Sequence, residues 1–196
     1  MVYRNGARET DLICVSGDLG AAFMGLQLLE REKAVLKGGD KDLQPDFSGK
    51  EYLLERQQQP AAPRAVIQKL AEEGIQPTSM MDISDGLSSE LLHICTQCKV
   101  GCRVYEEHIP IDYQTAVMAE EFNMNLSTCA LNGGEDYELL FTVPLTAHEA
   151  VSKLKDVKII GHITKPELGC ALVTRDGNEL ELKAQGWNPL KNQEKE

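Results

Sequence analysis

The sequence predicts an α+β fold, a mixed α/β sandwich in which helices cover a mixed β-sheet. Predicted strands and helices alternate irregularly along the chain, so a regular doubly wound parallel sheet is not expected. Two short strands near the C-terminal end are separated by Asp176-Gly177-Asn178, which is typical of a hairpin turn. The 196 residues contain no repeat and no clear linker, and we therefore treat residues 1–196 as one domain.

Apolar residues that recur at steps of three and four predict the helices. In one helix, for example, apolar residues occupy positions 87, 91, 94, 95 and 98. Pro60 and Pro63 separate two of the helices, and Gly74 is typical of the position just beyond a helix end. The predicted helices cover residues 19–32, 51–58, 64–73, 87–98, 111–122 and 147–154.

Short apolar runs bounded by turn residues predict the strands. The strongest run ends at Pro144 and is preceded by residues 129–134, which we expect to be turn-rich. Residues 37–50 are expected to form a loop. The predicted strands cover residues 11–17, 79–85 (running into a turn), 100–105, 137–143, 157–163, 171–176 and 179–183.

The charge balance excludes some classes of partner. The chain has 20 basic and 31 acidic residues, for a net charge of -11. This balance argues against a nucleic-acid binder, which needs a positive surface, and against binding to an anionic membrane. The chain has no run of 18 apolar residues and no signal-peptide core, so we expect a cytoplasmic protein whose six cysteines are reduced thiols.

The sharpest chemical signal is Asp82-Ile83-Ser84-Asp85-Gly86-Leu87, in which two acids flank a hydroxyl between a strand and a helix. Ser84 or Asp85 could simply cap the helix, with Gly86 easing the turn. A cap does not account for Asp82, which follows an apolar stretch and is expected to be partly buried. Buried carboxylates need a hydrogen-bonding partner or a metal. Two interpretations of this motif therefore remain open, a helix cap and a metal- or phosphate-binding site.

A second signal is Asn132-Gly133-Gly134-Glu135-Asp136-Tyr137-Glu138. The glycine pair permits a close backbone approach to a ligand and can expose N–H groups to an anion. The alternative is a tight turn with solvated acids. Neighbouring residues of a strand point to opposite faces, so at most one of Glu135 and Asp136 is expected to face a given site.

Several further features are open to two interpretations. Gly17-Asp18-Leu19-Gly20 resembles a phosphate-binding turn, but it is neither GxGxxG nor GxxxxGK[ST], and a helix start capped by Asp18 explains it better. Arg4 is either a phosphate ligand or a surface charge. Trp187, the single tryptophan, either holds the chain end to the core or stacks on a flat ligand ring.

Cys95-x-x-Cys98, followed by Cys102, suggests zinc or redox chemistry. However, Cys95 and Cys98 lie on the apolar face of the predicted helix 87–98, where cysteine packs as a small hydrophobic residue. There is no second CxxC motif, and the histidines do not have familiar metal-ligand spacing. We therefore interpret these cysteines as packing residues.

Together these motifs resemble the C-terminal half of thiamine-monophosphate kinase. The resemblance rests on residues 82–87 and on Gly133-Gly134-Glu135-Asp136-Tyr137-Glu138-Leu139. Arg4-Asn5-Gly6-Ala7, Asp11-Leu12-Ile13 and Gly17-Asp18-Leu19-Gly20 resemble the start of that half, and Gly186-Trp187 resembles its closing glycine-aromatic pair. The motifs occur in the same order and span nearly the whole chain. The wider superfamily includes aminoimidazole ribonucleotide synthetase, selenophosphate synthetase and a hydrogenase maturation factor.

The resemblance implies a PurM C-terminal-domain-like fold and an ATP-dependent kinase that converts thiamine monophosphate to thiamine diphosphate with Mg²⁺. Phosphoryl transfer of this kind relies on positioning and charge neutralisation, and it needs no covalent residue. The resemblance further implies a homodimer for the full-length family member. Carried over residue by residue, it assigns Asp82 and Asp85 to Mg²⁺, Arg4 and Ser84 to ATP, and Glu135 and Trp187 to thiamine monophosphate.

One departure from the family is large. Its members carry an N-terminal domain that binds ATP and Mg²⁺, and we expect this domain to be absent from the chain. Gly38-Gly39-Asp40 has the letters of that domain's Gly-Gly-Asp motif but follows Arg4 in a predicted loop, so we do not equate the two. We therefore expect little or no kinase activity from the chain alone.

Three alternatives stay open. The first is a non-catalytic module that binds thiamine phosphate, and the second is another ATP-dependent synthetase of the same superfamily. The third, a zinc module, has the least support.

Overall fold

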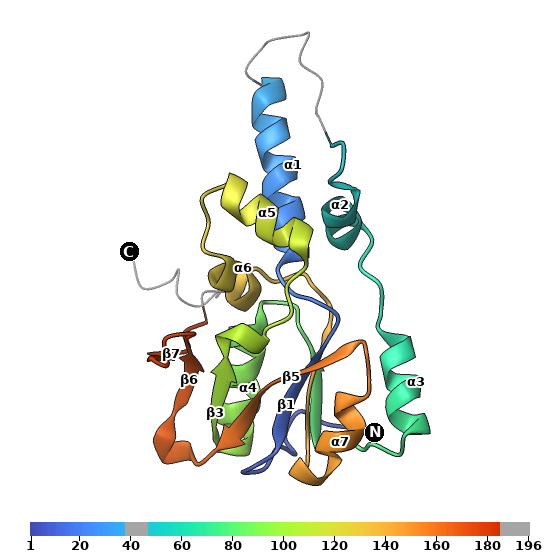
Figure 1. Ribbon diagram of the computed structural model, residues 1–196, viewed down its shortest axis with the longest axis vertical. Coiled ribbons are helices and arrows are strands. Elements are labelled where there is room, and N and C mark those ends of the chain that lie inside the picture. The colour runs from blue at the N-terminus through green and yellow to red at the C-terminus, as the bar shows by residue number, and fades with distance from the viewer. Residues whose placement is uncertain (38–46, 185–196) are drawn as a thin grey trace, which may run out of the picture.

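The computed structural model describes residues 1–37 and 47–184. A mixed β-sheet forms the lower part of the molecule in Figure 1, and helices lie on its faces and above one end. The strands are β1 (Leu12–Ser16), β2 (Ser79–Asp82), β3 (Gly101–Tyr105), β4 (Leu139–Val143), β5 (Val157–Thr164), β6 (Cys170–Val173) and β7 (Glu179–Glu181). The α-helices are α1 (Ala21–Lys37), α2 (Glu51–Gln58), α3 (Arg64–Glu72), α4 (Leu87–Cys98), α5 (Tyr113–Glu121), α6 (Leu126–Asn132) and α7 (His148–Ser152).

The seven strands have the order β2-β4-β1-β5-β3-β6-β7. Among the described strands, β3 and β6 form the parallel pair, and the other neighbours are antiparallel. Cys102 lies opposite Cys170 in the parallel pair. This mixed sheet confirms the predicted α+β sandwich.

Strand β1 lies inside the sheet, between β4 and β5, and is buried along its whole length. Ile13 and Val15 belong to a core that also contains Leu91 of α4, whereas Cys14 packs on the opposite side with Val66 of α3. Successive strand residues point to opposite faces, so a strand covered by helices on both sides has no polar alternation.

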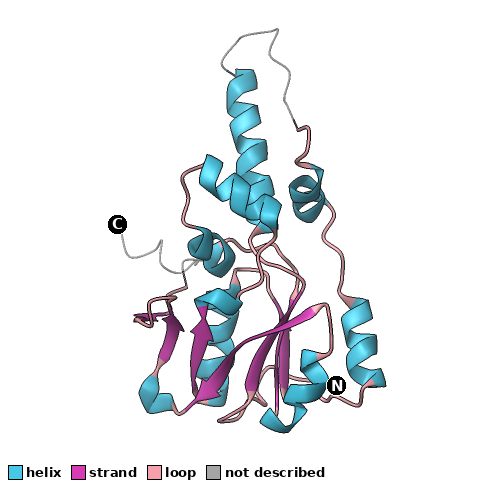
Figure 2. Cartoon of the chain, in the orientation of Figure 1, coloured by secondary structure: helices cyan, strands magenta, loops and turns pink. Residues whose placement is uncertain are grey.

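Helices α1, α2, α5 and α6 stand beyond one end of the sheet (Figure 2). They share a third core that includes Met24, Leu53, Met118 and Cys129. Gly25 allows α1 and α2 to pack closely, because a Cβ built at this position would lie 2.2 Å from the carbonyl oxygen of Leu53. These helices thereby fix the loops that leave this end of the sheet.

The structure corrects several element boundaries. Residues 126–132 form α6, which includes part of the segment 129–134 that we expected to be turn-rich. At the start of α6, the Asn125 side chain accepts a hydrogen bond from the Thr128 N–H at 2.9 Å. Helix α1 begins at Ala21 and extends to Lys37. Strand β4 begins at Leu139, two residues later than predicted. Most of the expected loop over 37–50, including Gly38-Gly39-Asp40, lies outside the described residues.

The predicted hairpin at the end of the sheet is confirmed. Strands β6 and β7 pair antiparallel, and the Thr174 N–H donates to the carbonyl oxygen of Asn178 at 2.9 Å.

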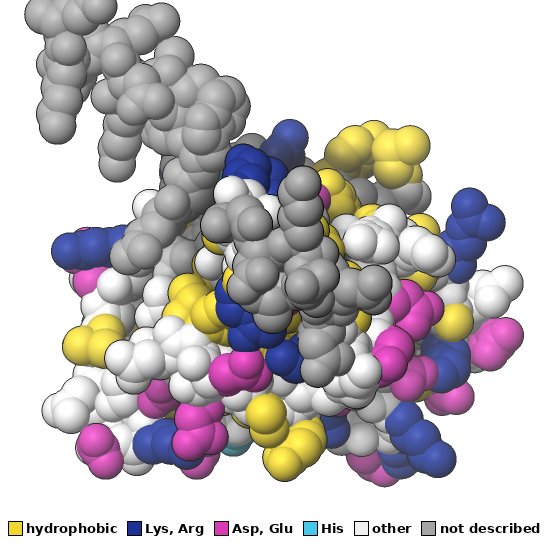
Figure 3. Space-filling view, turned by 90° about the horizontal axis from the view of Figure 1, so that it is seen from above, with side chains coloured by type: hydrophobic (Ala, Val, Ile, Leu, Met, Phe, Trp, Pro, Cys, Tyr) yellow, Lys and Arg dark blue, Asp and Glu magenta, His cyan; other side chains and the backbone are white. Residues whose placement is uncertain are grey.

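Among the described segments, no helix combines the length and apolar character that crossing a membrane requires. In the view from above, acidic and basic side chains are interspersed with separate small hydrophobic patches (Figure 3).

Candidate functional site

The two acidic motifs of the sequence lie against each other. The loop 83–86 connects β2 to α4, and the loop 133–138 connects α6 to β4. The Ile83 N–H donates to the Glu138 carbonyl oxygen, and the Tyr137 N–H donates back to the Ile83 carbonyl oxygen, both at 2.8 Å. The Glu135 N–H donates to the Ser84 carbonyl oxygen at 2.8 Å. These hydrogen bonds continue the β2–β4 pairing beyond the strands, so the two loops form one unit.

Glycine is required where the loops meet. Gly134 has φ +69°, and a Cβ there would lie 2.7 Å from the Ser84 carbonyl oxygen. Gly86 has φ +114°, and a Cβ there would lie 2.8 Å from the Leu131 carbonyl oxygen. The sequence left a ligand contact and a tight turn open for the glycine pair, and the structure shows that Gly134 lies against the backbone of the first motif.

Three carboxylates point into solvent at this edge: Asp82, Asp85 and Glu135 are exposed. The Tyr137 hydroxyl donates to Glu135 Oε2 at 3.4 Å. The negative charge of Glu135, with smaller contributions from burial and from Asp82 and Asp85, raises the pKa of Tyr137. The Tyr137 phenol therefore contacts Glu135 and feels the charges of Asp82 and Asp85, so acids of both motifs lie near one side chain.

The expectation that Asp82 is partly buried is wrong. Asp82 is the last residue of β2, and β2 is an edge strand of the sheet. An edge strand has no neighbour on one side, so its end opens to solvent. The apolar residues before Asp82 pack inward while its carboxylate stays hydrated.

Asp82 lies between two pockets. One pocket of about 460 Å³ is lined by Arg4 and Asp82, and another of about 470 Å³ is lined by Asp82, Glu135 and Tyr137. The second pocket has a mainly apolar wall, contributed by Pro60, Ala62, Pro63, Ile67 and Leu139. Arg4 is exposed, and it lines the first pocket but not the second. Trp187 lies outside the described residues.

The loop backbone turns Glu135 and Asp136 apart. Glu135 and Tyr137 have positive φ values of 64° and 51°, a region that side chains with a Cβ rarely occupy. Between them, Asp136 is 1% exposed and faces away from the solvent. The expectation that only one of the two acids faces a given site is confirmed, although the cause is this loop geometry rather than a strand. Such strain is characteristic of functional sites.

Asp136 caps helix α1. Its carboxylate accepts hydrogen bonds from the N–H groups of Gly20 at 2.9 Å and Ala22 at 3.4 Å. A carboxylate is favourable there because the N-terminus of a helix carries partial positive charge. Burial raises the pKa of Asp136 from its usual 3.8 to about 6. The expected cap, Asp18, does not fill this role, since its carboxylate accepts from the Tyr52 hydroxyl instead.

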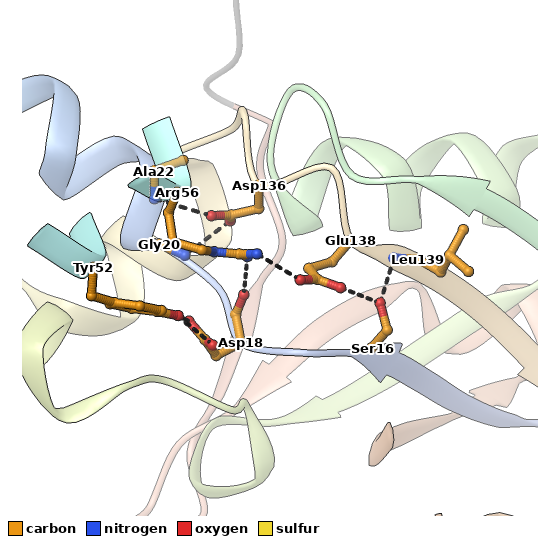
Figure 4. A network of polar contacts seen from close by, with 9 residues as sticks. All are labelled: Ser16, Asp18, Gly20, Ala22, Tyr52, Arg56, Asp136, Glu138 and Leu139. Carbon is orange, nitrogen blue, oxygen red and sulfur yellow. Dashed lines mark hydrogen bonds and ion pairs between the residues drawn. The ribbon is translucent and has the colours of Figure 1, made fainter. Parts of the chain in front are cut away.

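Glu138 anchors the base of the loop through a buried network (Figure 4). Ser16 Oγ donates to Glu138 Oε2 and accepts from the Leu139 N–H at 2.8 Å. Arg56 Nη1 donates to Glu138 Oε1 at 2.8 Å, and Arg56 Nη2 donates to the Asp18 carbonyl oxygen at 3.0 Å. Arg56 thus connects α2 to both the Gly17–Gly20 turn and the second motif.

Glu90 is the buried support of the first motif. Its Oε1 accepts from the Asp85 N–H at 3.1 Å and from Ser84 Oγ at 3.5 Å. Burial raises the pKa of Glu90. Neither Ser84 nor Asp85 caps α4 through its side chain, which corrects the simple capping interpretation. The position of Glu90 in the first turn of α4 could have indicated from the sequence that it contacts the preceding loop. No local sequence pattern indicates the role of Arg56.

The donor set fits Mg²⁺. Mg²⁺ usually keeps several waters and is held by one or two carboxylates together with substrate phosphates. Asp82 and Asp85 offer exposed carboxylates of this kind. They do not form a closed cage of their own: among the described residues, the cysteines 95, 102 and 170 are the group that brings three ligand atoms within 4.8 Å.

Comparison with known proteins defines the class. Residues 11–171 match the family model of the AIR synthase related protein, C-terminal domain. The chain therefore belongs to the family of AIR synthase-related C-terminal domains, and the PurM C-terminal-domain-like fold is confirmed.

Within that class, the resemblance to thiamine-monophosphate kinase is confirmed. The chain is 32% identical to thiamine-monophosphate kinase of Pyrococcus abyssi over 97% of its length, and 32% identical to that of Aquifex aeolicus over 95%. These alignments cover 53% and 54% of the two relatives, so the chain spans about half the length of the curated relatives it matches.

Solved structures agree with this comparison. AaThiL complexed with AMPPCP and TMP superposes with a TM-score of 0.74 at 31% identity, covering 95% of this chain and 53% of that one. Escherichia coli HypE, a hydrogenase maturation protein, has a TM-score of 0.69 at 19% identity, covering 97% of this chain and 54% of that one. The second likeness shows the fold alone.

The Arg56–Glu138 pair generates a stability prediction. Arg56→Met leaves Glu138 as an unpaired, largely buried carboxylate, so we expect a loss of about 3 kcal/mol in the free energy of unfolding. Lys153→Met breaks the exposed pair with Glu149 and is the control, with an expected loss below about 0.5 kcal/mol. Urea unfolding of both variants measures the difference. Adding Glu138→Gln to Arg56→Met should recover part of the loss, and equal losses in the two single variants would contradict the network's role.

Asp136 generates a pH prediction. Its pKa is higher in the fold than the usual 3.8, so between pH 3.8 and about 6 the folded state holds more of this proton than the unfolded state. Stability from this group therefore rises as the pH falls through that window. When the pH falls from about 7 to 4.5, the free energy of unfolding of the wild-type chain should increase relative to that of Asp136→Asn by on the order of 1 to 3 kcal/mol. Urea unfolding of both proteins at the two pH values measures this gain, and a relative loss by the wild type would contradict it.

Proposed function

We propose that this chain is the C-terminal, substrate- and magnesium-binding part of a thiamine-monophosphate kinase. The whole enzyme would transfer the γ-phosphoryl group of ATP directly to a phosphate oxygen of thiamine monophosphate, releasing ADP. The observation that carries the proposal is the junction of the two motif loops, which leaves Asp82, Asp85 and Glu135 exposed together. Sequence similarity to curated kinases over nearly the full chain supports it.

The arrangement suits phosphoryl transfer. The transferred group and both neighbouring oxygens carry negative charge, so catalysis depends on orientation and on charge neutralisation rather than on a protein nucleophile. Mg²⁺, held by Asp82 and Asp85, would neutralise phosphate charge. The exposure of both carboxylates supports this role, because phosphate oxygens must complete the coordination.

The two pockets beside Asp82 would hold the phosphoryl donor and the acceptor separately. Arg4 lines the pocket on one side of Asp82 and would bind a phosphate of ATP, with Ser84 in the adjoining loop. Glu135 and Tyr137 line the other pocket, whose apolar wall suits a flat heterocycle. We assign this second pocket to thiamine monophosphate, and we assign Trp187 to stacking on the same ligand.

The proposal also covers the activity of the chain by itself. The matched kinases are about twice as long as the aligned region, so we infer that regions outside it contribute residues to the complete site. We expect the purified chain to give little or no thiamine diphosphate. If adding the other half of such a kinase as a separate protein gives turnover, the chain is part of a kinase, whereas binding without turnover would identify a non-catalytic module.

Calorimetric titration tests the site directly. Thiamine monophosphate should bind the purified chain in the presence of Mg²⁺ and a non-hydrolysable ATP analogue. Glu135→Gln should weaken this binding about tenfold to a hundredfold, because a hydrogen bond to a charged group is lost. Asp82→Asn should remove the dependence on Mg²⁺. Glu149→Gln, on α7, is the matched control and should bind as the wild type does.

Fluorescence provides a second readout, since Trp187 is the single tryptophan. A saturable change with thiamine monophosphate supports its assignment to the substrate. Tighter binding of a different phosphate-bearing substrate, with none of thiamine monophosphate, would contradict the proposal and favour another synthetase of the superfamily.

A further inference from the structure

Cys95 and Cys102, which are close in the sequence, meet the distant Cys170 where strands β3 and β6 begin. Cys95 lies on α4, Cys102 on β3 and Cys170 on β6, and their Sγ atoms all lie within 4.8 Å of one another. Figure 1 shows α4, β3 and β6 side by side. All three residues are free thiols, and none of them belongs to the site described above.

The fold explains why these sulfurs meet. Cys102 and Cys170 are in register on neighbouring parallel strands, so their side chains share one face of the sheet. Helix α4 packs on that face, and Cys95 and Cys102 belong to the same buried core. Cys98, the other half of the CxxC sequence, is directed elsewhere, with its Sγ 3.7 Å from the carbonyl oxygen of Arg4. The third sulfur therefore comes from Cys170 and not from Cys98.

We propose that Cys95, Cys102 and Cys170 form a binding site for a soft divalent cation of the zinc type. Thiolate sulfur is a preferred ligand of such ions, and a Zn–S distance of about 2.3 Å places three sulfurs about 4 Å apart. The three Sγ atoms lie within 4.8 Å of one another, so side-chain shifts of about 1 Å or less would bring them to this spacing. Binding would form three metal–sulfur bonds and release three thiol protons to solvent.

Charge and exposure favour a divalent ion with one open position. Three thiolates around a divalent cation leave one net negative charge, whereas a monovalent ion would leave two in a largely buried place. Arg103 donates from Nη1 to the carbonyl oxygens of Cys102 at 3.0 Å and Gly169 at 3.1 Å, but Glu179 already balances its charge through an ion pair at 2.8 Å. Cys95 and Cys102 are buried, but Cys170 is only half-buried, which gives a water molecule access to a fourth ligand position.

Cobalt substitution tests the site in the full chain. The reduced protein, titrated with Co²⁺ in the absence of oxygen, should bind one ion. Its spectrum should show thiolate-to-cobalt charge transfer and the d–d bands of four-coordinate geometry. Zn²⁺ should displace the Co²⁺ and raise the thermal unfolding midpoint. Absence of the charge-transfer band in the wild-type chain would overturn the proposal whatever the variants show.

The matched variants are Cys170→Ser and Cys98→Ser. We expect Cys170→Ser to weaken Zn²⁺ binding more than about 100-fold, since a direct ligand is lost, and Cys98→Ser to bind as the wild type does. Circular dichroism verifies that both variants fold. The reverse order of effects would favour the CxxC pair and overturn the proposal. A disulfide between Cys102 and Cys170 in air, combined with no Zn²⁺ binding by the reduced chain, would also overturn it.

Discussion

The backbone pairing between the two motif loops is the interaction on which the candidate site depends. Ile83 exchanges hydrogen bonds with Glu138 and Tyr137, and Ser84 accepts one from Glu135. This pairing extends the β2–β4 ladder past the end of the sheet, and it holds two segments about 50 residues apart in one geometry. Without it, the exposed carboxylates would lie on independent loops.

The acidic residues of these motifs divide into two groups by environment. Asp136, Glu138 and Glu90 are buried, and each is held by hydrogen bonds that fix a loop or a helix end. Asp82 and Glu135 are exposed beside the pockets. A buried carboxylate must find donors within the protein, whereas an exposed one stays available to a cation. The buried group builds the site, and the exposed group is free to bind.

The sequence predicted most elements and both motifs because these depend on local patterns. Helix α4 has the predicted bounds, since its apolar spacing is regular and Gly86 precedes it. Asp82 was predicted to be partly buried but is exposed. Its exposure depends on which strand forms the edge of the sheet, and local sequence does not show this. The left-handed conformation of Tyr137 delays the start of β4, and apolar alternation does not show this.

Contacts between residues far apart in the chain could not be predicted from the sequence, because they depend on how helices and strands pack. Arg56 lies on a polar helix, and its contact with Glu138 appears only when α2 packs against α1. Cys170 meets Cys102 only because β6 pairs with β3 in parallel, although other strands separate them in the chain. The CxxC spacing pointed to Cys98 instead, because sequence distance is a poor guide to neighbours across a sheet.

Nuclear magnetic resonance of the isotopically labelled chain tests the central claim most directly. Thiamine monophosphate is added together with Mg²⁺ and a non-hydrolysable ATP analogue, and the backbone amide shifts are followed. The paired-loop account predicts saturable shifts at residues 82–86 and 133–138, with α7 and the β6–β7 hairpin unchanged. Saturable shifts that cluster elsewhere and leave both loops unperturbed would contradict it.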